Sequence, residues 1–438
     1  MDLFIQIAQL ILALSILVIL HEFGHFIPAR LFKIKVEKFF LFFDVKFALF
    51  KKKIGDTVYG VGWLPLGGYV KIAGMIDESM DKEQMAKPPE PWEFRSKPAW
   101  QRLIVMVGGV TVNVLLAWFL YSAMLMYYGD TYVPANKLKY GIGVSKAGAA
   151  LGFQNGDQIL AVDGKEMDRF DKFLPMDVLL GDEVTVERNG QPLTFTIDET
   201  GKKQVLESQE GPFISPQAGT ILDKVGDTTI AYAAGFRGGE KLQAFNGKTV
   251  TNWTEVQDQI DVVKGDSVRI DFERDGQRNT AVFFLPKESV LGVRADLDEL
   301  FITEEFTFME AVPKGWTRTV GVLTKQIRQF KLIFNKEVQG YKQVKGPIGI
   351  VSMMKTTWQW EPFWNFVAMF SVWLAFVNIL PIPALDGGHV MFLLYEMITG
   401  RKPSEKTLER GQIIGFIIVM GLMVIIFGND IWNLIKGS

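Results

Sequence analysis

The chain contains no cysteine and only three histidines among its 438 residues. Without cysteine it can form no disulfide, thiolate metal site or cysteine nucleophile, so any bound metal must be held by His, Asp or Glu. A large net charge of either sign is also lacking, because 47 Lys and Arg against 49 Asp and Glu leave a formal net charge of only −2. This balance gives no electrostatic support for a general nucleic-acid-binding role.

Apolar residues, by contrast, are abundant and grouped. They make up 48% of the chain, whereas the charged fraction of 22% is close to that of ordinary soluble domains. Four segments lack charged residues, and each is long enough to cross a bilayer as a helix: residues 3–20, 103–129, 362–385 and 411–428. We therefore predict a polytopic α-helical membrane protein with four transmembrane helices joined to a water-soluble region.

The first apolar segment could instead be a cleaved signal peptide. Asp2 stands where a basic n-region is expected, the apolar run exceeds a usual h-region, and no A-x-A site precedes His21. We predict a retained span.

Basic residues beside the spans predict the orientation, because Lys and Arg resist translocation. They follow the first span, precede the second, and lie between the third and fourth: Arg30, Lys33, Lys35, Lys38; Arg95, Lys97, Arg102; Arg401, Lys402, Lys406, Arg410. These flanks are expected to be cytoplasmic, with both termini and residues 130–361 on the opposite side.

The segment between the second and third spans contains an internal repeat. Residues 152–165 align without a gap on residues 235–248, and residues 187–191 recur as 273–277. Each copy predicts a strand, a tight Asp-Gly or Asn-Gly turn, a helix and a hairpin. The pattern resembles circularly permuted bacterial PDZ domains, which bind an extended chain at a strand edge. The alternative is a pair of small β-domains that act as spacers.

After the second copy, apolar residues recur at helical spacing: Val320, Leu323, Ile327, Phe330 and Phe334. This predicts an amphipathic helix that either lies on the bilayer surface or packs against the repeats.

Two histidines lie in His21-Glu22-Phe23-Gly24-His25, which continues the first apolar segment directly. Residues four apart share a helix face, so both imidazoles can reach one ion while Glu22 approaches water bound to it. Ionisable groups at membrane depth cost roughly 2.5 kcal/mol or more each, which favours a functional role over histidines that merely lie at the span end. We predict that His21 and His25 bind zinc and that Glu22 is catalytic.

A catalytic zinc needs a third protein ligand and one open position. We predict Asp386, which ends the third apolar segment between two prolines that break a helix and two glycines that permit close approach. The alternatives are a turn or N-cap role for Asp386, and ligation by His389 in its place. We assign His389 no catalytic role.

Residues 57–75 alternate β-formers around Pro-Leu-Gly-Gly and predict a hairpin that is too apolar for an open loop. A surface hairpin is the alternative.

Together these features resemble the site-2 protease family of intramembrane metalloproteases, and its bacterial members in particular. The resemblance rests on residues 21–25, 65–71, the tandem PDZ-like repeats, and residues 346–350 and 385–387. It implies a re-entrant hairpin that pairs with unwound substrate, in a fold with four transmembrane helices and two inserted mixed α/β PDZ-like domains. It also implies a bacterial inner-membrane location, with periplasmic PDZ domains and an active site toward the cytoplasm.

The resemblance further implies zinc-dependent cleavage of single-span membrane proteins, including an anti-sigma factor already trimmed by another protease, and leftover signal peptides. Two positions depart from the family pattern. Val110 stands where proline is usual in the second span, and Phe42-Phe43-Asp44 stands near the place of a usual Gly-Phe-Gly.

Peptide hydrolysis needs an extended backbone, so an edge strand and a side-chain amide could hold the unwound substrate. The substrate-binding residues that we expect are Asn378, Gly67, Gly68, Tyr69 and Val70. A packing role is the alternative for Asn378. The repeats contain no histidine or nucleophile constellation, so we expect them to select substrates.

A non-enzymatic PDZ scaffold and an ion transporter are the rival functions. The scaffold gives no reason for Glu22 between two histidines, and the transporter gives none for tandem peptide-binding grooves. The predicted organisation begins with a first span that carries the zinc motif (1–30), a loop with the hairpin (31–100) and the second span (101–129). Two PDZ-like domains (130–220 and 221–308) and an amphipathic segment (309–360) follow. The chain ends with the third span (361–390) and a loop with the fourth span (391–438).

Overall fold

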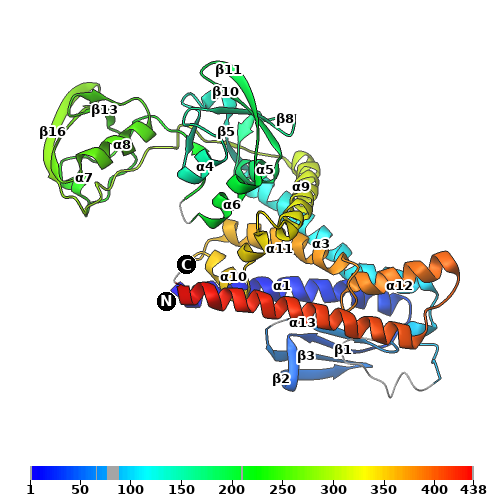
Figure 1. Cartoon of the computed structure of the whole chain (residues 1–438). Helices are drawn as coiled ribbons and strands as arrows, with labels where there is room; N and C mark the ends of the chain where they lie inside the picture. Colours follow the sequence, from blue (N-terminus) through cyan, green and yellow to red (C-terminus); the bar gives the residue numbers. More distant parts are fainter. Residues whose placement is uncertain (1, 66, 76–87, 209–210, 437–438) are drawn as a thin grey trace. The chain divides into compact units, whose positions relative to one another are not determined.

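The computed structural model describes every residue except 1, 66, 76–87, 209–210 and 437–438 (Figure 1). The chain divides into two compact units. The membrane unit comprises Met1–Gly129, Glu305–Phe330 and Val344–Ser438. The β unit comprises Asp130–Glu304 and Lys331–Gln343. Leu66 of the predicted 57–75 hairpin lies outside the described residues.

Among the described residues, four helices of the membrane unit are long and apolar enough to cross a bilayer, as predicted. They are α1 (Asp2–Leu31), α3 (Ala99–Tyr128), α11 (Trp360–Ile379) and α13 (Glu405–Lys436). The shorter helices are α10 (Pro347–Met353) and α12 (Asp386–Thr399), while α9 (Phe308–Phe334) runs from this unit into the β unit. The predicted boundary at residue 390 falls inside α12.

The presence or absence of proline explains the course of two of these helices, α3 and α11. With Val110 in place of a proline, α3 continues without interruption to Tyr128. The helix α11 ends at Ile379, because Pro381 and Pro383 cannot continue it. The chain restarts as α12 at Asp386, so the uncharged run 362–385 is longer than the helix within it.

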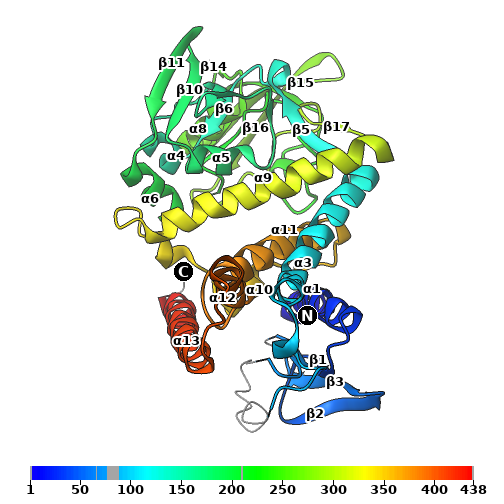
Figure 2. The ribbon, with the colours of Figure 1, turned by 90° about the vertical axis from the view of Figure 1, so that its right-hand side faces the viewer.

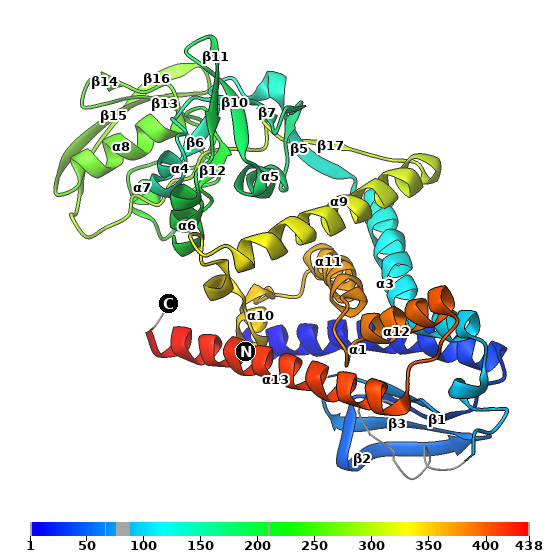
Figure 3. The ribbon, with the colours of Figure 1, turned by 45° about the vertical axis from the view of Figure 1, so that its right-hand side comes forward.

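A four-stranded sheet lies beside the C-terminal part of α1 (Figure 3). Its strands are β1 (Val36–Leu41), β2 (Phe43–Ile54), β3 (Thr57–Leu64) and β4 (Tyr69–Ile72), in the order β2-β3-β1-β4. The predicted pairing within residues 57–75 is therefore wrong. The two strands β3 and β4 pair with opposite edges of β1, parallel and antiparallel, and the hairpin is formed by β2 and β3.

The β unit contains two domains with separate hydrophobic cores, one for each sequence repeat. The first β-domain runs from β5 to β12 and the second from α7 to β16. Their sheets have the same strand order, β11-β10-β7-β8 and β16-β15-β13-β14. The short strands β17 and β5 pair where the chain enters and leaves this region.

The elements of the first β-domain are β5 (Asp130–Pro134), β6 (Ile142–Val144), α4 (Lys146–Ala150), β7 (Gln158–Val162), β8 (Lys165–Glu166), β9 (Arg169–Phe170), α5 (Leu174–Leu180), β10 (Glu183–Arg188), β11 (Gln191–Thr196), α6 (Glu199–Glu207) and β12 (Ile214–Pro216). Those that follow are α7 (Ile230–Ala233), β13 (Lys241–Phe245), β14 (Lys248–Thr249), α8 (Trp253–Val263), β15 (Asp266–Arg274), β16 (Gln277–Leu285) and β17 (Ile302–Glu304).

The repeat also preserves an ion pair between an arginine and a buried carboxylate. In the first domain Arg188 donates to both carboxylate oxygens of Asp157, at 2.8 and 2.7 Å. In the second, Arg274 donates to the fully buried Glu240. Burial raises the pKa of Glu240, but hydrogen bonds from two backbone N–H groups and from Arg274 outweigh it, so the net pKa lies below the ordinary value.

The predicted amphipathic helix is the central and C-terminal part of α9. One face packs on the membrane unit: Val322 is buried with residues of α3 and α11, and the Gln326 amide donates to the Met369 carbonyl at 3.3 Å. Val320 and Ile327 remain more than 40% exposed.

The last helix, α13, lies to one side of α12, away from α3 (Figure 2). Near its end, the buried Asp430 carboxylate accepts hydrogen bonds from Gly346, Ile348 and Gly349 at the start of α10, at 2.8–3.2 Å. These bonds satisfy N–H groups that have no partner within the helix.

Candidate active site

The structure brings His21, His25 and Asp386 together. The two Nε2 atoms lie 3.3 Å apart, and Asp386 Oδ2 lies 3.4 Å from His21 Nε2 and 3.3 Å from His25 Nε2. Among the described residues, this is the group of His, Asp and Glu side chains whose arrangement could hold a metal ion. His389 lies nearby but does not belong to the group.

Helix geometry and a tight loop produce this arrangement. The imidazoles share a face of α1 because they are four residues apart. The carboxylate comes from the first residue of α12, after the loop that Pro381 and Pro383 impose. Segments more than 350 residues apart in sequence thus meet at one point.

Both imidazoles are held by their outer nitrogens. His25 Nδ1 lies 2.9 Å from the Val105 carbonyl oxygen, which can only accept, so this nitrogen carries the proton and Nε2 keeps its lone pair. His21 Nδ1 lies 3.1 Å from the amide of the fully buried Asn113, whose Oδ1 has no other partner in the described part of the chain. If the amide turns by 180°, Oδ1 can accept the Nδ1 proton of His21.

The donor set fits a zinc ion. Asp386 Oδ2 is buried and receives no hydrogen bond from any described residue, although it faces two imidazole nitrogens. Such an unsatisfied oxygen is costly unless a cation or proton compensates it. Two imidazoles and a carboxylate are common ligands of catalytic zinc.

Helix α3 approaches α1 closely behind the histidines. A Cβ on Gly108 would lie 1.9 Å from the Gly24 carbonyl oxygen, and a Cβ on Gly109 would lie 2.4 Å from His25 Nε2. These positions have room only for glycine, which lets the two helix backbones approach.

Glu22 lines a cavity of about 570 Å³ together with His21, His25 and Asp386. The predicted residues Gly67, Gly68, Tyr69 and Val70 line this cavity too, so the edge strand β4 borders the histidines.

The individual contacts of these predicted residues differ. Gly68 has no room for a side chain, because a Cβ there would lie 2.5 Å from Val18 Cγ1. The Tyr69 ring stacks on Phe40, and its hydroxyl donates to Asp44 at 2.8 Å, so this side chain supports the sheet.

Asn378, on the last turn of α11, also lines the cavity. Its amide nitrogen lies 3.3 Å from His21 Nε2. No role was predicted from the sequence for Gln412, which lines the cavity, or for Asn113, which lies against His21. For Asn113 the signal was available, because a polar side chain inside an uncharged span is expensive. Gln412 lies near a helix end, where polar residues are ordinary.

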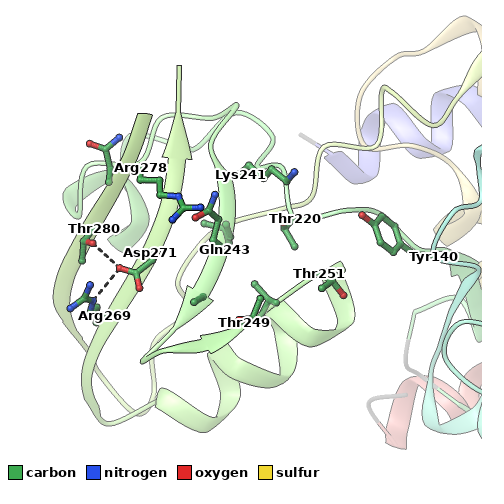
Figure 4. A pocket seen from close by; sticks show the side chains of 14 residues that line it. Tyr140, Thr220, Lys241, Gln243, Thr249, Thr251, Arg269, Asp271, Arg278 and Thr280 are labelled. Carbon is green, nitrogen blue, oxygen red and sulfur yellow. Dashed lines mark hydrogen bonds and ion pairs between the residues drawn. The ribbon is translucent and has the colours of Figure 1, made fainter. Parts of the chain in front are cut away.

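A second cavity, of about 710 Å³, is lined mainly by the second β-domain and also by Tyr140 of the first (Figure 4). Asp271 in its wall accepts hydrogen bonds from Thr280 at 2.7 Å and Arg269 at 3.1 Å, and these bonds lower the pKa of Asp271. Its lining residues are mostly polar, with Leu242, Ala244 and Val250 among them, and within the described ranges they include no His, so no metal centre is expected there.

Comparison with known proteins agrees with the geometry. Residues 9–422 match the model of peptidase family M50. Similar proteins include a Neisseria meningitidis protein named as a zinc metalloprotease, 28% identical, with 97% of this chain and 98% of the relative aligned. Two others are named regulator of sigma-E protease: that of Haemophilus influenzae, 27% identical over 98% of this chain and 99% of the relative, and RseP of Escherichia coli, 26% identical over 97% and 98%. The chain belongs to peptidase family M50, the site-2 protease family, and is a metalloendopeptidase.

Proposed function

We propose that this protein is a zinc-dependent protease that cleaves peptide bonds within the transmembrane segments of single-span proteins. The observation that carries the proposal is the convergence of His21 and His25, from the apolar helix α1, with Asp386, the first residue of α12. These three side chains would hold the ion and leave one position open. A bound zinc ion would supply Lewis-acid activation of water and of the scissile carbonyl.

Glu22 has the role of proton carrier in this proposal. Its carboxylate faces the cavity beside the two imidazoles, takes a proton from the attacking water, and then gives it to the leaving amine. Val70 of β4 lines the same cavity as this carboxylate. Asn378, 3.3 Å from His21 Nε2, is placed to donate its amide protons to a substrate carbonyl.

The location and substrates follow from the same site and from the relatives' names. Basic flanks favour an inner-membrane protein with its active site toward the cytoplasm and the β unit in the periplasm. Two relatives are named for sigma-E regulation, which supports a membrane-anchored anti-sigma factor as a substrate. Remnant signal peptides are a second proposed substrate class.

The proposal predicts that activity depends on one zinc ion. Purified protein should contain about one zinc per chain and cleave a single-span test substrate in detergent or vesicles. A strong chelator should remove both zinc and cleavage, and stoichiometric zinc should restore cleavage. Metal analysis and gel-based cleavage measure both quantities. Full cleavage by protein that has lost its zinc would contradict the proposal, as would zinc-loaded protein that cleaves nothing.

Substrate binding is proposed to occur at the edge of β4. A helical substrate hides its amides, so it must unwind before hydrolysis, and an unpaired strand edge can then hold it. In the sheet, β4 is an edge strand and β1 covers only one of its sides. Its other side borders the cavity that contains Glu22.

Val70→Pro should therefore weaken substrate binding, because proline removes a backbone donor from β4. The variant is best tested in a Glu22→Gln background, which prevents cleavage of the substrate during the binding measurement. We expect binding of a helix-destabilised substrate to weaken about fivefold, the effect of one hydrogen bond. Val70→Ala, which keeps the N–H, is the control. Equal affinities in crosslinking titrations of both variants would reduce β4 to a structural strand.

The β unit is proposed to consist of two PDZ-like domains that gate access rather than take part in the chemistry. Its described residues include no metal cluster, and each domain carries its own core and a repeat-related fold. Size exclusion of bulky ectodomains is favoured over capture of a chain end.

Removal of residues 135–301 tests this gating. The strands β5 and β17 pair through Tyr132 and Ile302, so a short flexible linker can join the cut ends. The shortened protein should still cleave a substrate with a short ectodomain and should gain cleavage of one with a folded ectodomain. Gating is wrong if the ratio of the two cleavage rates equals that of the full-length protein.

A further inference from the structure

The loop before Asp386 contains a residue in an unfavourable conformation. Ala384 has φ of +78°, in the left-handed region that residues with a Cβ seldom adopt. Such a conformation persists only where the surroundings hold it, and it is often found at functional sites. Ala384 lies two residues before the proposed zinc ligand, so its conformation sets the direction from which the chain reaches Asp386.

The surroundings that hold Ala384 come from α13. Gln412 is 6% exposed, and its Oε1 accepts a hydrogen bond from the Ala384 N–H at 3.2 Å. One turn later, Gly415 lies directly against the loop, because a Cβ there would be 1.6 Å from the Pro383 carbonyl oxygen. The helix backbone therefore packs on the loop, and the glutamine bonds its strained residue.

The loop itself is tight, so a change at Ala384 cannot be absorbed before Asp386. Ile382 N–H donates to the Leu380 carbonyl at 2.7 Å, and Leu385 N–H donates to the Ile382 carbonyl at 3.0 Å. A Cβ on Gly388 would lie 2.5 Å from Pro383 Cα. The first turn of α12 therefore packs tightly against the loop.

We propose that Gln412 is a positioning residue: it holds Ala384 in its left-handed conformation and thereby aims the Asp386 carboxylate at the two imidazoles. This inference rests on the proposed function, in which Asp386 binds zinc. Gln412 also lines the catalytic cavity, and α13 is fixed at its far end by Asp430, so the loop is supported by an anchored helix. The effect acts through the loop, since the bond is made to Ala384 and not to Asp386.

Gln412→Met keeps length and volume but removes the acceptor. The zinc dissociation constant of the full-length protein, measured by competition with a chelator, should rise about tenfold, because loss of a residue that supports a metal ligand typically lowers metal affinity by at least that factor. The visible absorption of the Co²⁺-loaded protein should change as well, because that absorption reports the arrangement of the ligands. Ile414→Met, at an exposed position of the same helix, is the control and should change neither.

Ala384→Gly supplies the decisive second variant. Glycine adopts positive φ without steric cost, so it should keep the loop conformation when the glutamine is absent. Gln412→Met combined with Ala384→Gly should therefore recover most of the zinc affinity and the Co²⁺ spectrum. A purely structural role of Gln412 in α13 packing would not be rescued in this way.

Ala384→Val provides a test that leaves α13 intact, which matters if Gln412→Met fails to fold. A branched side chain increases the strain at positive φ and should lower zinc affinity by a similar factor. Unchanged zinc affinity in both Gln412→Met and Ala384→Val would overturn the inference, and so would a double variant that is no better than Gln412→Met. If the wild-type protein itself binds neither Zn²⁺ nor Co²⁺, the proposed function fails instead.

Discussion

Glu22→Gln is expected to lower the rate of peptide hydrolysis by about 10²–10⁴-fold while zinc remains bound, because the amide cannot carry a proton but is not a metal ligand. The side chain keeps its size, and although it lines the same cavity as the three proposed ligands, it is not one of them. Single-turnover cleavage of a single-span substrate and zinc per chain are the two measurements.

Asp386→Asn is the matched comparison for this variant. It also exchanges a carboxylate for an amide at the same site, but it removes a proposed ligand whose Oδ2 lies 3.3–3.4 Å from both imidazoles. We expect it to lose zinc after dialysis that leaves Glu22→Gln fully loaded. Equal zinc retention by both variants would remove Asp386 from the ligand set, and normal turnover by Glu22→Gln would remove Glu22 from the chemistry.

Gly109→Ala is expected to weaken zinc binding and cleavage together, although it adds only one methyl group. That Cβ would lie 2.4 Å from His25 Nε2 and 2.6 Å from His21 Cε1, so both imidazoles must move or the helices must separate. Overpacking of this kind costs about 1–3 kcal/mol, and here the strain falls on the ligands themselves. Zinc content and cleavage should both fall at least tenfold.

Gly421→Ala serves as the control for this substitution. Gly421 lies in the membrane helix α13, and a Cβ there would meet no atom within 4 Å. Zinc content, cleavage and thermal unfolding in detergent should match those of the wild-type protein. If Gly109→Ala binds zinc and cleaves as Gly421→Ala does, the close approach of α3 to the histidines is not a requirement of the site.

The strand pairing near the site shows where sequence patterns stop being sufficient. The β-forming segments at 57–64 and 69–72 are evident from their residues, and both are strands. Their partner is not, because a strand pattern shows which residues can face a core but not which neighbour completes the ladder. The intervening strand, β1, lies 16 or more residues upstream and has two usable edges.

The amino-acid sequence by itself determined the four spans, the repeat and the residues that meet at the site. Each depends on a local property. A long apolar run without charge indicates a membrane span, a four-residue spacing puts two histidines on one helix face, and two prolines end α11. The tertiary structure alone decided the distances within the cluster, the glycine contact behind the histidines, and the support of Ala384 by Gln412. These depend on how close distant backbones approach, which is set by the packing of whole helices and leaves no periodic signal along the chain.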